Sequence, residues 1–252
     1  MTRRRDRLRL SLFAAVCGVF LLHLLAGPLR AENREQKDLV DQSRMTLQNF
    51  LEDSNMSWFR DHIKDAKGIF IVPQLLKAAF FLGGEGGSGV FLTRDDKTGE
   101  WSQPAFYTMG AGSFGFQFGA QASEIVLLVM SQRGVESLLS NTFKLGGDVS
   151  VAVGPVGAGI EGSSAMNLSA DMLSFAKAKG LFGGISLEGA VIAIRNEWNR
   201  QYYGKEARPT DILIKRSVTN AQSESLRAAL KKAVAGDSST SSSDEPGKPA
   251  PE

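Results

Sequence analysis

The sequence has few of the side chains that most often carry chemistry. Among its 252 residues there is one cysteine, Cys17, and there are two histidines, His23 and His62. A disulfide needs two cysteines, and a zinc site needs several cysteine or histidine ligands. No G-x-S-x-G elbow is present to supply the serine of a Ser-His-Asp hydrolase. We therefore predict no disulfide, no metal site, no cofactor and no catalytic residue.

The first 31 residues have the order of an export signal. A basic start, MTRRRDRLRLS, precedes the mostly apolar run LFAAVCGVFLLHLLAG, and Ala31 then offers a small residue ahead of polar sequence. This is the order of regions in a secretory signal peptide. The alternative is an uncleaved anchor, but the run is shorter than the roughly 20 residues that span a bilayer. We expect residues 1–31 to be a signal peptide that directs the chain to the periplasm or envelope, or to secretion.

Charge is nearly balanced once this segment is set aside. Six of the 29 Lys and Arg residues and one of the 27 Asp and Glu residues lie within residues 1–31. Residues 32–252 therefore carry 23 basic and 26 acidic side chains, a net charge of −3. No nucleic-acid partner is predicted, because the mature chain lacks the excess positive charge that binds a phosphate backbone.

The remaining histidine and the C-terminal end have simple interpretations. His62 lies in WFRDHIKDAKG, a charged segment that we expect to form a helical surface and not a catalytic site. Residues 236–252, GDSSTSSSDEPGKPAPE, contain no large apolar side chain. Such a segment cannot bury enough surface to offset its ordering entropy. We predict one folded domain over residues 32–235 and a disordered tail over residues 236–252.

Glycines are concentrated in the middle of the chain. Twenty-one of the 27 lie between Gly83 and Gly189, and the dinucleotide-binding pattern G-x-G-x-x-G occurs there three times, at residues 84–89, 110–115 and 157–162. That pattern binds a nucleotide only where a strand leads into a helix N-terminus. The sequence FGFQFGAQ after the second match has the period of a strand instead. We predict no nucleotide partner, and we expect the glycines to permit bends, bulges and close backbone approach in a curved sheet.

Hydrophobic periodicity predicts helices near both ends of the folded region. In residues 34–52, Val40, Leu47 and Leu51 share one face, as in an amphipathic helix. Ser131 is placed to cap a short helix, Gly204 to end another, and Thr210 to cap the segment DILIK. The expected helices cover residues 34–52, 56–65, 131–141, 195–204 and about 217–234.

Strands follow one another between these helices. A hairpin is predicted where the polar turn DDKTG separates SGVFLTR from EWSQPAFYTMGAG. Residues 123–130, SEIVLLVM, indicate a buried strand, and residues 171–182 and 185–194 suggest a further strand pair. Pro73 is expected to restrict its strand to an edge or an end of the sheet.

This order of elements predicts the fold class. Strands in a row, with helices mostly at the N- and C-terminal ends, favour an α+β fold with a mainly antiparallel sheet. Many short strands interrupted by glycine suggest that the sheet curves towards a barrel or sandwich.

Five ordered segments resemble the SYLF domain family. They are DAKGIFIVPQLLKAAFFLGGEGGSGVFLTR, WSQPAFYTMGAGSFGFQFGAQASEIVLLVM, KLGGDVSVAVGPVGAG, FAKAKGLFGGISLEGAVI and the YYG…ARPTDIL end. The resemblance covers about residues 38 to 216. The eukaryotic branch of this family is known as an actin regulator of yeast and as a lipid-binding module in animals.

The resemblance implies phospholipid binding, with phosphatidylinositol lipids favoured in eukaryotic relatives, through an N-terminal amphipathic helix and basic residues. The counterpart helix here is residues 34–52. The alternative is that the apolar side chains pack on the sheet and that the lysines are solvated surface. The lipid-binding candidates are Arg34, Lys37, Arg44, Trp58, Phe59, Lys64, Lys67, Lys77, Lys177 and Lys179.

Two departures from the eukaryotic pattern change the expected partner. The sequence carries an export signal and lacks an SH3 domain, so cytosolic actin is not expected and the exported bacterial branch fits better. Phosphoinositides are scarce outside the cytosol, which makes anionic bacterial phospholipid or a membrane surface the expected ligand. We predict an exported, membrane-associated, non-catalytic phospholipid-binding domain. The alternative is an envelope protein-interaction or structural module that docks through its glycine-rich face.

Overall fold

The computed structural model describes residues 33–79, 82–114, 119–157, 169–178, 181–183 and 187–235. The predictions for residues 1–31 and 236–252 lie outside these ranges. The described helices are α3 (Arg34–Glu52), α4 (Ser57–His62), α5 (Gln132–Leu139), α6 (Asn196–Tyr203) and α7 (Glu224–Ala235). The described strands are β1 (Gly68–Ala79), β2 (Leu82–Thr93), β3 (Ala105–Phe114), β4 (Gly119–Val129), β5 (Thr142–Lys144), β6 (Val151–Val153), β7 (Met172–Ala178), β8 (Leu181–Gly183) and β9 (Val191–Ile194).

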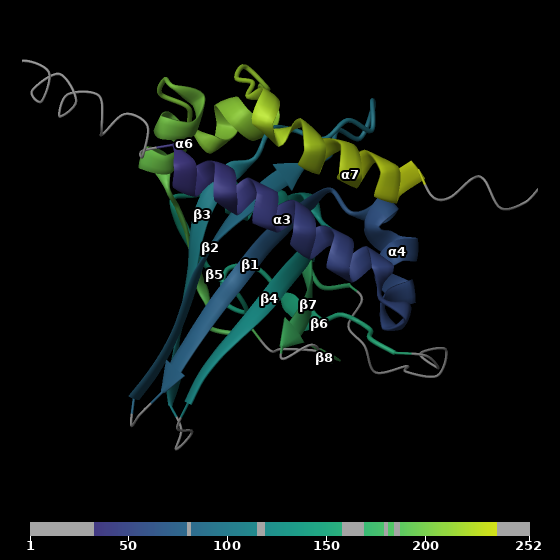
Figure 1. Ribbon diagram of the computed structural model, residues 1–252, viewed down its shortest axis with the longest axis vertical. Coiled ribbons are helices and arrows are strands. Elements are labelled where there is room, and N and C mark those ends of the chain that lie inside the picture. Colours follow the sequence, from purple (N-terminus) through teal and green to yellow (C-terminus); the bar gives the residue numbers. More distant parts are fainter. Residues whose placement is uncertain are drawn as a thin grey trace, which may run out of the picture.

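These strands form one curled sheet with α3 and α7 lying across one face (Figure 1). The strand order is β5-β9-β3-β2-β1-β4-β7-β6, and β8 pairs with β7. Among the described strands only β6 and β7 pair in parallel. The two outermost strands, β5 and β6, are joined by a short connection in which Leu145 forms a bridge with Val149. The α+β prediction with a curved, mainly antiparallel sheet is confirmed.

Because side chains alternate between the two faces of each strand, the sheet has a separate hydrophobic core on each face. On β3, Phe106 points towards the helices and packs against Tyr202 of α6, while Tyr107 points into the curl. The Tyr107 hydroxyl donates to the carbonyl of Leu138 in α5 at 2.5 Å. Helix α5 therefore closes the inside of the curl, while α3, α4, α6 and α7 cover the outside.

Helix α3 has the bounds that its periodicity predicted. Its buried side chains include Val40, Leu47 and Phe50, which pack on the outer face of the sheet. Glu124 of β4 fixes its position by accepting hydrogen bonds from Thr46 Oγ1 at 3.2 Å and from Asn49 Nδ2 at 3.1 Å. The apolar face of this helix is therefore part of the protein core.

The prediction for Pro73 is wrong. Strand β1 is central, because it pairs with β2 on one side and with β4 on the other. Its pairing with β2 shifts between Ile71 and Leu76, and its pairing with β4 shifts between Val72 and Leu75. Proline has no N–H to donate to a ladder, and a bulge is the place in a sheet where none is needed.

Two other local predictions are also wrong. Residues 171–182 and 185–194 do not form a strand pair: β7 pairs with β4, β6 and β8, whereas β9 pairs with β3 and β5. Nearness in sequence favoured a hairpin, but the chain instead crosses from one side of the curl to the other. Thr210 does not cap a helix, since it follows Pro209 and begins the π-helical turn Thr210–Ile214 without a side-chain cap hydrogen bond.

Glycines on β2 allow the backbone of β1 to approach closely, as the sequence predicted. A Cβ on Gly87 would lie 2.4 Å from the Gln74 carbonyl oxygen, and a Cβ on Gly89 would lie 2.7 Å from that of Ile71. Both contacts come from the bulged part of β1. Gly110 and Gly112, from the second nucleotide-type match, lie within β3. They are followed by another strand, β4, and so do not stand at a helix N-terminus.

Asp171 joins three segments next to the start of β7. Its carboxylate accepts hydrogen bonds from Ser131 Oγ at 2.5 Å, from Ser150 Oγ at 2.7 Å and from the Ser150 N–H at 3.0 Å. Ser131 in turn caps α5 by accepting from the N–H of Gly134 at 3.0 Å, as predicted. Burial alone would raise the pKa of Asp171, but the hydrogen bonds from Ser131 and Ser150 outweigh it and lower that pKa.

We expect Gly87→Ala to lower the free energy of unfolding by about 1–3 kcal/mol, because the new methyl group collides with the bulge of β1. Gly112→Ala is the matched control, since no atom of the described residues lies within 4 Å of its Cβ position. Chemical denaturation followed by circular dichroism measures both. Equal stabilities for the two variants would contradict this account of the glycine.

We expect Asp171→Asn to cost about 1.5–3 kcal/mol of stability at neutral pH, since charge-assisted hydrogen bonds are lost. A carboxyl whose pKa is lowered by folding stabilises the protein above its unfolded pKa, and this contribution disappears as the pH falls through the folded pKa. The difference between wild type and variant should therefore be constant above about pH 5 and shrink towards about pH 2. A pH-independent difference in urea unfolding would show that the charge of Asp171 is not involved.

Candidate anion-binding pocket

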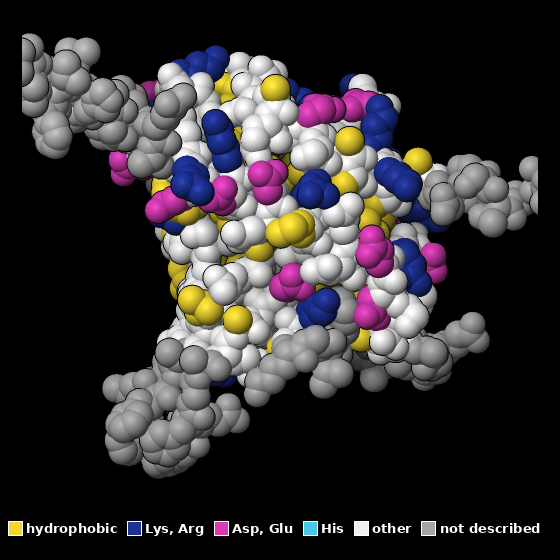
Figure 2. Space-filling view, viewed as in Figure 1, with side chains coloured by type: hydrophobic (Ala, Val, Ile, Leu, Met, Phe, Trp, Pro, Cys, Tyr) yellow, Lys and Arg dark blue, Asp and Glu magenta, His cyan; other side chains and the backbone are white. Residues whose placement is uncertain are grey.

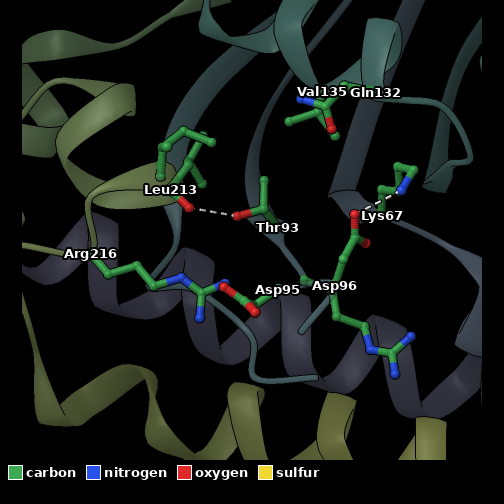
Figure 3. Close-up of a pocket in the computed structure, with 10 residues that line it drawn as sticks. Lys67, Thr93, Asp95, Asp96, Gln132, Val135, Leu213 and Arg216 are labelled. Atoms are coloured by element: carbon green, nitrogen blue, oxygen red, sulfur yellow. Dashed lines mark hydrogen bonds and ion pairs between the residues drawn. The ribbon is translucent and has the colours of Figure 1, made fainter. Parts of the chain in front are cut away.

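A small polar pocket lies where β1 begins and β2 ends. Its volume is about 170 Å³, which suits a headgroup and not a whole lipid, since typical small-molecule pockets start at roughly 300 Å³. Figure 3 shows Lys67 facing Asp96 on one side of the pocket and Arg216 facing Asp95 on the other. It is lined by Lys67, Thr93, Arg94, Asp95, Asp96, Gln132, Val135, Leu213, Ile214 and Arg216.

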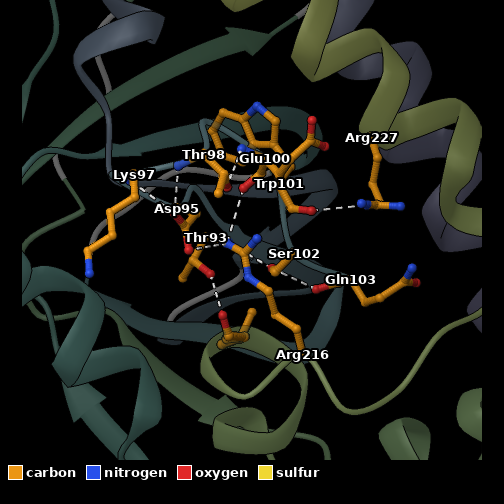
Figure 4. Close-up of polar contacts among 11 residues, drawn as sticks. Thr93, Asp95, Lys97, Thr98, Glu100, Trp101, Ser102, Gln103, Arg216 and Arg227 are labelled. Atoms are coloured by element: carbon orange, nitrogen blue, oxygen red, sulfur yellow. Dashed lines mark hydrogen bonds and ion pairs between the residues drawn. The ribbon is translucent and has the colours of Figure 1, made fainter.

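One wall is the turn after β2, and its sequence explains its shape. The Asp95 carboxylate accepts hydrogen bonds from the N–H groups of Thr98 at 2.8 Å and Lys97 at 2.9 Å, and Gly99 adopts a positive φ of 71° (Figure 4). Aspartate followed by glycine is typical of such a turn. The hydrogen bond from the Thr98 N–H, followed by that from Lys97, holds the pKa of Asp95 below its usual value. The predicted hairpin is confirmed, with the turn DDKTG at its tip.

The other wall is the π-helical turn Thr210–Ile214 and the residues after it. Thr93 Oγ1 donates to the Leu213 carbonyl at 2.8 Å and so joins this turn to the end of β2. Arg216 has a φ of 53°, a left-handed conformation that costs a non-glycine residue roughly 1–2 kcal/mol. Its guanidinium donates to the Glu100 carbonyl at 3.1 Å and lies 3.9 Å from Asp95 Oδ2 (Figure 4). These contacts hold the strained residue at the pocket.

Three cations and two carboxylates meet at this pocket. Lys67 Nζ lies 2.9 Å from Asp96 Oδ2 in an ion pair that is open to solvent on both sides. Arg94 donates from Nη1 to the carbonyl of Lys64, while its Nε is buried without a hydrogen-bond partner. The lining therefore has a formal charge of +1, which favours an anion.

An exposed apolar side chain stands at the edge of the pocket. Ile214 is 51% exposed and belongs to the pocket lining. An anion site beside an apolar side chain suits a surface that has both, such as the headgroup layer of a membrane. Within the described residues, no cluster of His, Cys, Asp and Glu is suited to hold a metal ion, and no helix has the length and apolar content needed to cross a membrane.

Of the ten predicted lipid-binding residues, Lys67 lines the pocket and Lys64 contributes its backbone carbonyl beside it. Arg94 and Arg216 were not predicted. They are about 120 residues apart in sequence, and neither belongs to a recognisable spacing pattern. The sequence offered only their positions as a signal: Arg94 directly precedes the turn DDKTG, and Arg216 follows shortly after PTDIL.

The predicted basic residues of α3 lie on its outer surface. Arg34 and Lys37 are exposed, and Arg44 donates to Gln48 Oε1 at 2.6 Å. Acidic residues are interspersed among them, and Asp38 lies 3.8 Å from Arg34. This surface therefore has no strong excess of positive charge.

The aromatic pair predicted as a membrane anchor is divided by the fold. Phe59 has no exposed surface and packs against Phe175, with ring centroids 5.2 Å apart. Trp58 is half-buried and stacks on His62 at 3.9 Å. Phe59 is thus a core residue in this structure, in line with the alternative that these aromatic residues pack on the sheet.

Two further predicted lysines, Lys77 and Lys177, lie away from the pocket. Lys77 is on β1 opposite Glu85 and Gln121 of the neighbouring strands. Lys177 lines a separate hollow together with Glu124. Lys179 is outside the described residues. The tertiary structure therefore does not gather the predicted cations into one patch.

A larger groove of about 590 Å³ lies between α3, α4 and α7. Leu51, Ala229 and Ala233 contribute its apolar lining. Its cation Arg60 is held by the carbonyl oxygens at the end of α3, including that of Leu51 at 3.2 Å. Glu52 and Asp61 balance Arg60 and Lys232 in the lining, so this groove is less suited to an anion.

Comparison with known proteins agrees with the fold and the motifs. A family model described as "Ysc84: Las17-binding protein actin regulator" matches residues 110–233. The chain is 37% identical over 169 residues to the human "SH3 domain-containing YSC84-like protein 1", covering 67% of this chain and 49% of that protein. It is 38% identical over 147 residues to "LAS seventeen-binding protein 3" of Saccharomyces cerevisiae (strain ATCC 204508 / S288c), covering 57% and 32%.

The chain thus spans about half the length of the animal relatives and about a third of the yeast relative. The region matched by the family model runs from within β3 to within α7 and includes β4 to β9 and the turn that carries Arg216. These similarities, together with the five motifs and the curled sheet, show that the chain belongs to the SYLF, or Ysc84-like, family.

Proposed function

We propose that this chain is an exported, non-catalytic phospholipid-binding domain that holds an anionic headgroup in the pocket of Lys67, Arg94 and Arg216. The observation that carries the proposal is the convergence of these three cations on one small pocket with only two carboxylates. Ile214 adds an exposed apolar contact at the edge. A basic residue near an anionic membrane contributes about 1 kcal/mol, so two or three of them give reversible, salt-sensitive binding.

In this proposal α3 contributes less to lipid binding than the family resemblance implied. Val40 and Leu47 are fully buried, so insertion of this face into lipid would require the helix to leave the sheet. Arg34 and Lys37 are exposed and available to a membrane surface. Export is supported by the signal-like residues 1–31, and anionic phospholipid is the acidic surface expected along that route.

A second candidate function is protein interaction. The family model is described as a Las17-binding actin regulator, and the yeast relative is named for binding Las17. An exported chain would meet different partners. A protein-interaction role is favoured here by the glycine-rich part of β2 and β3, which extends beyond α3 and is not covered by a described helix (Figure 1).

The first test is co-sedimentation with vesicles of neutral lipid and with vesicles containing anionic phosphatidylglycerol. We expect residues 32–252 to bind the anionic vesicles, with weaker binding at high salt. Lys67→Gln combined with Arg216→Gln should weaken this binding roughly tenfold or more, because two contacts of about 1 kcal/mol each are lost. Lys144→Gln combined with Lys232→Gln is the charge-matched control, since both lysines are exposed and lie outside the pocket.

Equal loss in both double variants would mean that only net charge matters and that the pocket is not the site. Absence of binding to every vesicle would overturn the membrane function. Thermal unfolding of each variant checks that the changes act on binding and not on folding.

Asp96→Asn should have the opposite effect. The Asp96 carboxylate competes with a lipid phosphate for Lys67, and 68% of its side chain is exposed, so its removal should disturb the fold little. We expect tighter binding to anionic vesicles by about fivefold, which corresponds to one freed cation of about 1 kcal/mol. Weaker binding of this variant would show that Asp96 contacts the ligand or orients Lys67.

A further inference from the structure

The segment of residues 100–103 connects one wall of the pocket to β3, and two arginines hold its backbone. On the pocket side, the Glu100 carbonyl accepts a hydrogen bond from Arg216 Nη2 at 3.1 Å. On the side of α7, the next carbonyl, that of Trp101, accepts a hydrogen bond from Arg227 Nε at 3.1 Å. Figure 4 shows the two arginines reaching this segment from different directions. Helix α7 and the pocket are therefore linked through two adjacent peptide groups.

Arg227 is the more firmly held of the two α7 cations that contact this segment. Its side chain is only 24% exposed, and its Nη1 lies 2.8 Å from Glu224 Oε2. Its partner Trp101 is buried. Lys231, one helical turn later, lies 2.7 Å from Glu100 Oε1, but both side chains of that pair are open to solvent, so it contributes little. The outer surface of α3, with its interspersed charges in Figure 2, takes no part in this arrangement.

The start of α7 is also fixed against the same segment. Gln103 Oε1 accepts hydrogen bonds from Ser223 Oγ at 2.6 Å and from the Asn220 N–H at 3.2 Å. Gln103 and Ser223 are both buried, and α7 begins directly after Ser223. Buried hydrogen bonds of this kind are costly to break, because an unpaired polar group would be left without water. Arg227, three residues into the helix, therefore keeps a fixed place beside Trp101.

Arg216 depends on this segment for the direction of its side chain. Its backbone has the left-handed φ of 53°, which is unfavourable for a residue with a Cβ. Its guanidinium donates to the Glu100 carbonyl at 3.1 Å, whereas Asp95 Oδ2, at 3.9 Å, is beyond hydrogen-bond range. The contact with Glu100 is thus the shorter of the two. A shift of that carbonyl would turn Arg216 away from the pocket without removing its charge.

We propose that Arg227 is a positioning residue of the headgroup pocket. By holding the Trp101 carbonyl it fixes the adjacent Glu100 carbonyl, and through that carbonyl it fixes the guanidinium of Arg216. This inference rests on the proposed function, since it concerns the affinity of that pocket for an anionic headgroup. Arg227 is not among the residues that line the pocket, so it acts through Arg216 and not on the ligand.

The test is a double-mutant cycle measured by co-sedimentation with vesicles containing anionic phosphatidylglycerol. We expect Arg216→Gln to weaken binding about fivefold, the factor for one basic residue near an anionic membrane. Arg227→Gln should weaken it about threefold, and the double variant should bind no worse than Arg216→Gln, because Arg227 acts only through Arg216. Lys232→Gln is the matched control: it removes the same charge from an exposed position of the same helix and should keep binding within about twofold of wild type.

A second measurement needs no lipid. The Asp95 N–H donates to the same Glu100 carbonyl at 3.0 Å, so its hydrogen exchange, followed by NMR, reports on the position of that carbonyl in the free protein. Arg227→Gln should speed this exchange about fivefold, whereas Lys232→Gln should leave it unchanged. Circular dichroism checks that every variant is folded.

Exchange of the Asp95 N–H at the wild-type rate in Arg227→Gln overturns the positioning role. Two binding results also overturn it: a double variant weakened by about fifteenfold, the product of two independent effects, and equal losses in Arg227→Gln and Lys232→Gln, which would show that only net charge matters. If the wild type binds no vesicle, the headgroup function fails. Faster exchange in Arg227→Gln alone would then still support the positioning of Glu100 by Arg227.

Discussion

The close contact between the bulged part of β1 and the glycines of β2 underlies the shape of this protein. Pro73 interrupts a strand with partners on both sides, and Gly87 and Gly89 allow the backbone of β1 to approach β2. A bulge bends and twists its strand more strongly than regular pairing does. The central strands thus curve, so that one end of the sheet supports the helices while the other extends beyond α3 (Figure 1).

The pocket lies at one end of this curved sheet. The pocket forms at the helix-covered end, where the turn after β2 meets the π-helical turn and Arg216. Towards the other end of β1, the strands extend beyond α3 (Figure 1).

The proposed headgroup pocket combines cations and carboxylates in a nearly neutral protein. The Asp95 carboxylate accepts hydrogen bonds from N–H groups of its own turn and forms an ion pair with Arg216. The Asp96 carboxylate forms an ion pair with Lys67. The carboxylates therefore position the cations and also reduce the net positive charge of the pocket. We expect such a site to give a modest affinity that depends on salt, because its ion pairs are partly open to solvent.

Sequence alone determined the features that depend on near neighbours. The bounds of α3, the cap by Ser131, the turn at DDKTG and the stop at Gly204 follow from periodicity and short-range hydrogen bonds. The resemblance of its motifs also identified the family. Only the tertiary structure decided that Pro73 lies in a central strand, that β7 and β9 are not partners, that Phe59 is buried, and that Arg216 and Lys67 line the same pocket. These features depend on register and on contacts between residues far apart in sequence, whose free energy exists only once the sheet has curled.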